Sequence, residues 1–248
     1  MASTILITGA TSGIGLETAR LLSKNGFDLI LCGRREDRLI NLKKELGEFS
    51  KVTTLKFDVR DQQEVVQALG SIDITPDVLL NNAGNAHGLS AIQDGDTSDW
   101  DAMIDINVKG LLYVSKAIIP SMIEKGGGHI INIGSIAGKE VYPNGNVYCA
   151  SKYAVDAISQ GMRIDLNKNG IRVSSINPGM VETEFAKVRF KGDEELANNA
   201  YKGYQPLKPE DIADIIHFII TRPKHVNIAD LLVLPTAQAT TSVFNKNL

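Results

Sequence analysis

The chain has 248 residues, of which 43% are hydrophobic and 22% charged, with a formal net charge of −3. This balance is typical of a soluble globular protein and gives no electrostatic reason to expect nucleic acid or an anionic membrane as a partner. No apolar run reaches the roughly 18 residues of a membrane span, and no basic leader precedes the first apolar strand. We therefore expect a cytoplasmic protein without a signal peptide.

Short aliphatic or β-branched runs alternate with helical patterns from end to end. Several runs are apolar throughout, as expected for parallel strands that are covered on both faces. Helical spacing recurs between them, as in Leu16–Asn25, Arg38–Glu48 and Asp61–Leu69. The predicted strands are Thr4–Thr8, Asp28–Cys32, Val52–Phe57, Val78–Leu80, His129–Ile133, Arg172–Ile176 and Leu231–Leu234.

This alternation predicts one α/β domain over residues 1–248, a Rossmann-type doubly wound, seven-stranded, mostly parallel sheet with helices on both faces. Asp61 and Glu64 have the spacing of a capping box, and Gly26 and Gly170 stand where left-handed helix ends are expected. The least regular stretch, 178–209, follows a strand. Because ligands of such sheets lie beyond the carboxyl ends of the strands, it is a candidate lid over a substrate.

The first predicted strand runs into the sequence Thr-Gly-Ala-Thr-Ser-Gly-Ile-Gly at residues 8–15. Such a turn between a strand and a helix lets backbone N–H groups approach a pyrophosphate. The spacing of Gly9, Gly13 and Gly15 is not the common G-x-G-x-x-G, and a purely structural turn would explain the glycines alone. The position of this glycine turn at the first strand–helix junction favours a dinucleotide-binding site.

Arg34 and Arg35 follow the second predicted strand, where a cofactor with a free ribose 2′-hydroxyl would usually meet an acidic residue. Guanidinium groups suit a 2′-phosphate through charge-assisted hydrogen bonds. A solvated arginine pair is the alternative, and Glu36 and Asp37 keep NAD from being excluded. With the glycine turn beside it, the pair favours NADP over NAD.

Further motifs follow in chain order: Asn-Asn-Ala-Gly at 81–84, Gly-Ser-Ile-Ala-Gly at 134–138, Tyr-Cys-Ala-Ser-Lys at 148–152 and Asn-Pro-Gly at 177–179. Together with the glycine turn they resemble the short-chain dehydrogenase/reductase family over nearly the whole chain. This resemblance implies an NADP(H)-dependent oxidoreductase acting on CH–OH groups. It also implies a homotetramer, with 102–124 and 150–167 as the contacting helices.

Tyr148 and Lys152 are four residues apart and would share one helix face. A free tyrosine has a pKa near 10, and lowering it to about 7 takes roughly 4 kcal/mol, which a nearby ammonium and the nicotinamide charge could supply. The resemblance implies Tyr148 as general acid/base and Lys152 as its partner. It further implies that Ser135 holds the substrate oxygen and that Asn107 anchors a proton-relay water. Alternatively, Ser135 is only a turn residue and Asn107 only a polar residue of a helix. Tyr142 lacks a lysine one turn on and is expected to be pocket wall.

The same resemblance implies a set of cofactor contacts spread along the chain. Asp58 and Val59 are expected to flank the adenine, and Asn82 to contact the adenosine ribose or to hold its own turn. The complete implied set is Gly9, Thr11, Ser12, Gly13, Ile14, Gly15, Arg34, Arg35, Asp58, Val59, Asn82, Ala83, Gly84, Tyr148, Lys152, Pro178, Gly179, Val181 and Thr183.

Residues 33–35, 179–193 and 229–236 are similar to those of NADP-dependent 3-hydroxy acid dehydrogenases. The implied substrates are serine, 3-hydroxypropanoate, 3-hydroxyisobutyrate or the matching aldehydes. Their carboxylate needs a cation, for which we favour Arg189. Lys187 and Lys191 are weaker candidates, and a solvated basic run is the alternative. The expected substrate-binding residues are Ser135, Tyr148 and Arg189; His87 could also face the pocket.

Other functions remain open. A sulfoacetaldehyde-type reductase or a 3-oxoacyl-carrier reductase would use the same catalytic residues, and an inactive NADP-sensing regulator would use the same fold. The polar tail 238–248 is expected to fray or to cross to a neighbour. The two cysteines, Cys32 and Cys149, lack metal-type spacing, so we expect both to be buried and expect no metal site.

Overall fold

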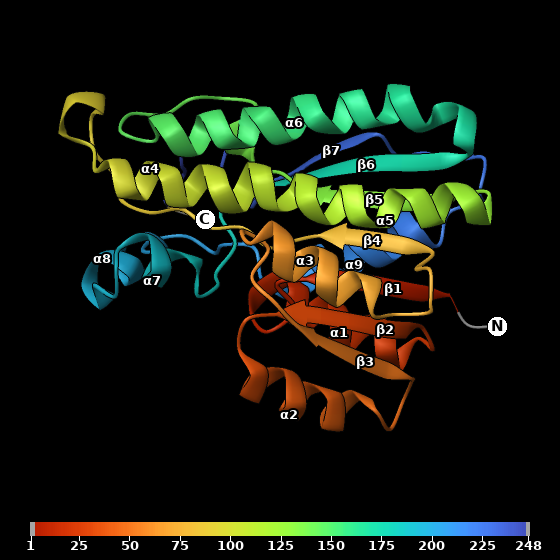
Figure 1. Cartoon of the computed structure of the whole chain (residues 1–248). Coiled ribbons are helices and arrows are strands. Elements are labelled where there is room, and N and C mark those ends of the chain that lie inside the picture. The colour runs from red at the N-terminus through yellow and green to blue at the C-terminus, as the bar shows by residue number, and fades with distance from the viewer. Residues whose placement is uncertain (1–2, 247–248) are drawn as a thin grey trace.

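The computed structural model describes residues 3–246. Within that range seven strands form one sheet in the order β3-β2-β1-β4-β5-β6-β7 (Figure 1). Every neighbouring pair is parallel. The predicted doubly wound α/β sheet is therefore confirmed, with no antiparallel member. The strands are β1 (Thr4–Thr8), β2 (Asp28–Gly33), β3 (Val52–Lys56), β4 (Val78–Asn81), β5 (Gly128–Ile133), β6 (Ile171–Pro178) and β7 (Asp230–Val233).

Helices cover both faces of this sheet, so alternate residues of one strand enter different cores. Ile5 and Ile7 of β1 belong to the cluster under α1, α2 and α9, whereas Leu6 belongs to the cluster under α3, α5 and α6. Burying such a side chain contributes about 1.5–3 kcal/mol. The helices are α1 (Gly13–Lys24), α2 (Glu36–Leu46), α3 (Gln62–Gly70), α4 (Thr97–Ile104), α5 (Leu111–Lys125), α6 (Asn146–Leu166), α7 (Phe185–Arg189), α8 (Glu194–Asn199) and α9 (Pro209–Ile220).

The strand order reverses between β1 and β4, which lie side by side. Ligands of doubly wound sheets bind at such a switch point, outside the carboxyl ends of the strands. Here the glycine turn that follows β1 meets residues 82–84, which follow β4. The fold thus brings together two motifs that are more than 70 residues apart in the chain.

Local signals at the helix ends are confirmed with one correction. Asp61 caps α3 by accepting hydrogen bonds from the backbone of Gln63 and Glu64. The Glu64 carboxylate, however, accepts from the backbone of Asp58 instead of closing a capping box with Asp61. Gly26 and Gly170 take the expected left-handed conformation, with φ of +80° and +69°.

The C-terminal tail does not fray within the described residues; residues 247 and 248 of the predicted tail lie outside them. The side chain of Gln238 is only 4% exposed, and its Oε1 accepts a hydrogen bond from the backbone of Met180 at 2.9 Å. Gln238 also pairs with Phe244 in an antiparallel bridge. The tail therefore packs against the segment after β6, at the border of the site described below. Among residues 3–246, no helix is long and apolar enough to cross a membrane.

Candidate active site

A cleft of about 440 Å³ runs along the carboxyl ends of the strands. It is lined by the turns after β1, β2, β4 and β5, by the start of α6 and by the segment from Pro178 to Tyr201. Of the predicted site residues, Gly15 and Asn107 do not line it. Those that do are Gly9, Thr11, Ser12, Gly13, Ile14, Arg34, Arg35, Asp58, Val59, Asn82, Ala83, Gly84, Ser135, Tyr148, Lys152, Pro178, Gly179, Val181, Thr183 and Arg189.

The glycine turn needs its glycines for close packing. Gly9 has φ of +65°, and a Cβ on Gly15 would lie 2.6 Å from the carbonyl oxygen of Gly9. Gly15 thus lies beneath the turn instead of facing the cleft. Asn82 donates from Nδ2 to the carbonyl oxygens of Thr8 and Gly9, at 2.9 and 3.2 Å. These bonds hold the glycine turn after β1 instead of the turn after β4 to which Asn82 belongs, and the expected contact with the adenosine ribose stays a prediction.

The arginines after β2 lie at the outer end of the cleft and are paired with carboxylates. Arg34 lies 3.5 Å from Asp58. Arg35 donates to the Thr11 and Ser12 hydroxyls and, from Nη1, to Glu184 at 2.9 Å. These contacts place guanidinium and hydroxyl donors around one point beside the glycine turn.

Two residues of this cluster were missed by the sequence analysis. Arg38 donates from Nη1 to Glu184 at 2.9 Å, and Glu184 thereby joins the start of α7 to α2. Although burial opposes it, the hydrogen bonds from Arg35 and Arg38 hold the pKa of Glu184 below its ordinary value. Arg35 and Glu184 are 149 positions apart in the chain, which leaves no local signal for this contact.

At the inner end of the cleft, α6 presents Tyr148 and Lys152 with exposures of 8% and 6%. Lys152 Nζ donates to the carbonyl oxygen of Ile133 at 3.0 Å. Ser135 lies opposite, directly after β5, and its Oγ accepts from the backbone of Ala137 at 3.1 Å. Ser135 is therefore a turn residue and a cleft residue at once.

Among the groups of the protein itself, burial dominates the pKa of Tyr148. Burial raises it above its ordinary value, and the Ser135 side chain and the charge of Arg189 only partly oppose this. Burial also lowers the pKa of Lys152 to about 8. Both groups lose hydration, and the ammonium of Lys152 is directed at a backbone carbonyl. The side chains alone therefore do not lower the pKa of Tyr148, and its lowering by the lysine together with the nicotinamide charge stays a prediction.

Asn107 lies in a π-helical turn, Asp105–Gly110, between α4 and α5. Its side chain accepts from the backbone N–H of Asn85 at 2.9 Å and donates to the carbonyl oxygen of Asn85 at 2.8 Å and to the Ser151 hydroxyl at 3.0 Å. Asn107 thus ties the loop after β4 to α6 from behind the cleft. Such π turns are frequent at functional sites.

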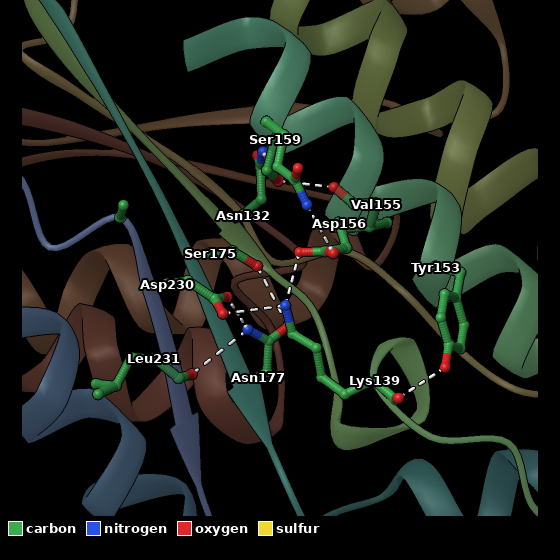
Figure 2. A network of polar contacts seen from close by, with 12 residues as sticks. Asn132, Lys139, Tyr153, Val155, Asp156, Ser159, Ser175, Asn177, Asp230 and Leu231 are labelled. Carbon is green, nitrogen blue, oxygen red and sulfur yellow. Dashed lines mark hydrogen bonds and ion pairs between the residues drawn. The ribbon is translucent and has the colours of Figure 1, made fainter. Parts of the chain in front are cut away.

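A polar network holds the Ser135 turn against α6 (Figure 2). Lys139, just after that turn, donates from Nζ to Asp156 of α6 at 2.8 Å and to Asp230 of β7 at 3.0 Å. Tyr153 Oη donates to the Lys139 carbonyl oxygen at 2.6 Å, and Asn177 Nδ2 donates to Asp230 at 2.6 Å. The relative positions of Ser135 and Tyr148 thus depend on β6 and β7 as well as on α6.

Of the three candidate cations in the predicted lid, only Arg189 lines the cleft. Its guanidinium lies 5.4 Å from the centre of the Tyr148 ring. Lys187 pairs with Glu194 and Lys191 with Asp99, at 2.7 and 3.0 Å. Arg189, the favoured cation, therefore lines the cleft, whereas Lys187 and Lys191 are paired with carboxylates outside it. His87 lies outside the main cleft, in a small adjoining recess.

Comparison with known proteins agrees with this geometry. The model of the short chain dehydrogenase family matches residues 3–194. The chain is 44% identical to sulfoacetaldehyde reductase 2 of Chromohalobacter salexigens and covers 96% of both chains. It is 45% identical to an NADP-dependent 3-hydroxy acid dehydrogenase of Salmonella typhi, covering 95% of this chain and 96% of that one.

Among solved structures, the closed form of a serine dehydrogenase complexed with NADP⁺ superposes with a TM-score of 0.92 at 41% identity, over 97% of this chain and 98% of that one. The family model, these relatives and the arrangement of tyrosine, lysine and serine around one cleft lead to the same conclusion. The chain belongs to the short-chain dehydrogenase/reductase family of oxidoreductases.

Proposed function

We propose that the protein is an NADP(H)-dependent dehydrogenase that interconverts a small 3-hydroxy acid, of the serine, 3-hydroxypropanoate or 3-hydroxyisobutyrate type, and its aldehyde or keto acid. The observation that carries the substrate class is Arg189. It is a guanidinium that lines the cleft beside Tyr148, and its hydrogen-bond partners are the neutral Tyr142 hydroxyl and Gly88 carbonyl. A carboxylate is the natural partner of such a group.

The outer end of the cleft fits NADP. The glycine turn brings backbone N–H groups and the start of α1 to the cleft, which suits a pyrophosphate. Arg34, Arg35 and the Ser12 hydroxyl are donors suited to a 2′-phosphate. The 3-hydroxy acid dehydrogenase from Salmonella typhi is named as NADP-dependent, and the serine dehydrogenase structure holds NADP⁺.

We assign the hydride and proton transfer to the inner end of the cleft, where Tyr148 lies. When bound, NADP⁺ supplies the hydride acceptor. In the oxidative direction the Tyr148 oxygen takes the hydroxyl proton while the hydrogen on the same carbon leaves as hydride, and a C=O bond forms. Ser135 holds the substrate oxygen, and the charges of Lys152 and Arg189 stabilise the phenolate. In the reductive direction a protonated Tyr148 donates its proton to the carbonyl oxygen, and the raised pKa of Tyr148 suits this step.

One second function has a specific finding in its favour. Sulfoacetaldehyde reductase 2 is as similar to this chain as the 3-hydroxy acid dehydrogenases are. A sulfonate would suit Arg189 nearly as well as a carboxylate. The 3-oxoacyl-carrier reductase and the inactive NADP sensor have no comparable support.

The test follows the absorbance of the reduced nicotinamide with NADP⁺ and NAD⁺ in parallel. The substrates are L-serine, D-serine, 3-hydroxypropanoate, 3-hydroxyisobutyrate and 2-hydroxyethanesulfonate. We expect NADP-linked turnover of at least one carboxylate, faster than that of the sulfonate. Turnover of the sulfonate alone would select the second function. No turnover of any of them, with NADPH still binding by fluorescence titration, would overturn the proposed substrate class.

A further inference from the structure

We propose that Tyr142 is a positioning residue that holds the Arg189 guanidinium at the substrate end of the cleft and thereby sets the preference for an anionic substrate. The inference rests on the proposed function, since it assigns the position of a cation whose ligand that function names. Tyr142 lines the cleft, as expected, but its contacts make it more than pocket wall.

Tyr142 begins a tight turn directly before α6. The Gly145 N–H donates to the Tyr142 carbonyl oxygen at 3.1 Å, and Asn144 takes a left-handed conformation with φ of +64°. A Cβ on Gly145 would overlap the Tyr142 ring, so the ring lies directly against the backbone of Gly145. Packing in this turn therefore fixes the direction of the Tyr142 hydroxyl before any ligand binds.

That hydroxyl accepts a hydrogen bond from Arg189 Nη2 at 2.6 Å. The guanidinium carbon lies 5.4 Å from the ring centres of both Tyr142 and Tyr148, so the cation stands between the two tyrosines. Contacts at this distance to aromatic faces are attractive. Arg189 therefore lies beside Tyr148, the proposed reacting group, while its Nη2 hydrogen bond is made to Tyr142.

A second anchor comes from the loop after β4. The Gly88 N–H donates to the Arg189 carbonyl oxygen at 2.9 Å, and Arg189 Nε donates to the Gly88 carbonyl oxygen at 3.4 Å. Gly88 has φ of +67°, and a Cβ there would lie 2.8 Å from Asp99. The backbone of Arg189 is thus held by Gly88, while the end of its side chain is held by Tyr142.

Both anchors of the side chain are uncharged. Burial raises the pKa of Tyr142 although the charge of Arg189 opposes this, so the phenol stays neutral at ordinary pH. Within residues 3–246 no carboxylate is ion-paired with Arg189, whereas Arg35 and Arg38 share Glu184. A neutral anchor orients the guanidinium and leaves its full charge for a ligand. A carboxylate anchor in the same place would compete with the substrate.

The test compares 3-hydroxypropanoate with 3-hydroxypropanamide, its uncharged counterpart of nearly the same shape. The measured quantity is the ratio of kcat/KM for the acid to kcat/KM for the amide in the wild type, Tyr142→Phe, Arg189→Gln and Tyr204→Phe. Tyr204 is the control because its hydroxyl likewise makes one hydrogen bond, which it donates to the carbonyl oxygen of Ala200 at 2.9 Å, and because Tyr204 does not line the cleft.

Tyr142→Phe keeps the ring and removes only the hydroxyl. We expect the acid-over-amide ratio to fall about tenfold, mainly through a higher KM for the acid, as loss of one hydrogen bond to a charged group predicts. Arg189→Gln should lower the ratio about 100-fold, and Tyr204→Phe should leave it at the wild-type value. NADPH affinity, measured by fluorescence titration, should change less than twofold in Tyr142→Phe.

The two proposals fail in different ways. A wild-type ratio in Tyr142→Phe together with a collapsed ratio in Arg189→Gln would overturn the role of Tyr142 and leave the proposed function standing. Equal loss of kcat on acid and amide in Tyr142→Phe would also overturn it, because the hydroxyl would then act on Tyr148 and not on Arg189. Wild-type ratios in both variants would overturn the proposed substrate class itself.

Discussion

Arg35 and Arg189 line the same cleft but have opposite kinds of partners. Arg35, at the outer end, donates to Glu184 in an ion pair whose side chains are 39% and 48% exposed. Arg189, at the inner end, is held by a tyrosine hydroxyl and a backbone carbonyl. Exposed ion pairs contribute only about 0–1 kcal/mol, so a phosphate could replace Glu184 at small cost. A partly buried guanidinium without a carboxylate has more to gain from an anionic ligand.

The two ends of the cleft therefore hold their cations differently. At the outer end, Glu184 keeps the arginines oriented beside the glycine turn and joins them to α7. At the inner end, neutral groups orient the cation, and the proposed function assigns its charge to the small substrate. Each of the following predictions disturbs one end of the cleft and measures a consequence specific to that end.

The largest effect is expected for Tyr148→Phe, which removes the proton-transferring oxygen and keeps the ring. Turnover should fall at least 1,000-fold, within the range that general acid–base groups contribute. NADPH affinity by fluorescence titration should stay within about twofold, because the arginines at the outer end are untouched. Substantial residual turnover would contradict the role of Tyr148.

Arg34→Ala disturbs the opposite end. Its side chain is 57% exposed and its ion pair with Asp58 is long, at 3.5 Å, so stability should change by less than about 1 kcal/mol. The KM for NADP should rise roughly 10- to 100-fold, and that for NAD no more than about twofold, since only NADP carries the 2′-phosphate. Equal rises for both cofactors would refute the assignment of Arg34 to that phosphate.

Lys152 supplies a pH-dependent effect of smaller size. Burial lowers its folded-state pKa to about 8, below the ordinary value of about 10.5. Between these values the unfolded chain binds more protons, so the free energy of unfolding rises with pH there. From pH 8 to 9.5 the wild type should gain about 1–2 kcal/mol relative to Lys152→Met in urea unfolding. Parallel pH profiles of the two proteins would show that the lysine is not perturbed.

The fold was predictable from local patterns in the chain. Apolar runs such as Ile5–Ile7 and the glycine turn that follows are local signals, because a strand covered on both faces has to be apolar throughout. Boundaries moved by one to three residues: α1 begins at Gly13 where its apolar pattern begins at Leu16, and β6 extends to Pro178. Helix capping and strand pairing, which depend on neighbours, set these ends.

Most of the predicted residues line the cleft, whereas their hydrogen-bond partners were not predictable. Motif spacing located Tyr148, Lys152 and Ser135, whereas the contact of Glu184 with Arg35 joins segments 149 residues apart. The contacts of Arg189 with Tyr142 and Gly88 span 47 and 101 residues. The raised pKa of Tyr148 follows from burial, which no pattern around residue 148 reveals. The cofactor roles of the lining residues and the homotetramer stay predictions.

The most direct test of the account is the acid-over-amide ratio in Arg189→Gln, with Lys187→Gln as the control from the same helix. Lys187 lies outside the cleft and is paired with Glu194 at 2.7 Å. We expect the preference for 3-hydroxypropanoate over 3-hydroxypropanamide to disappear in Arg189→Gln and to survive in Lys187→Gln. A preference that survives in Arg189→Gln would contradict the claim that this arginine is reserved for the substrate anion.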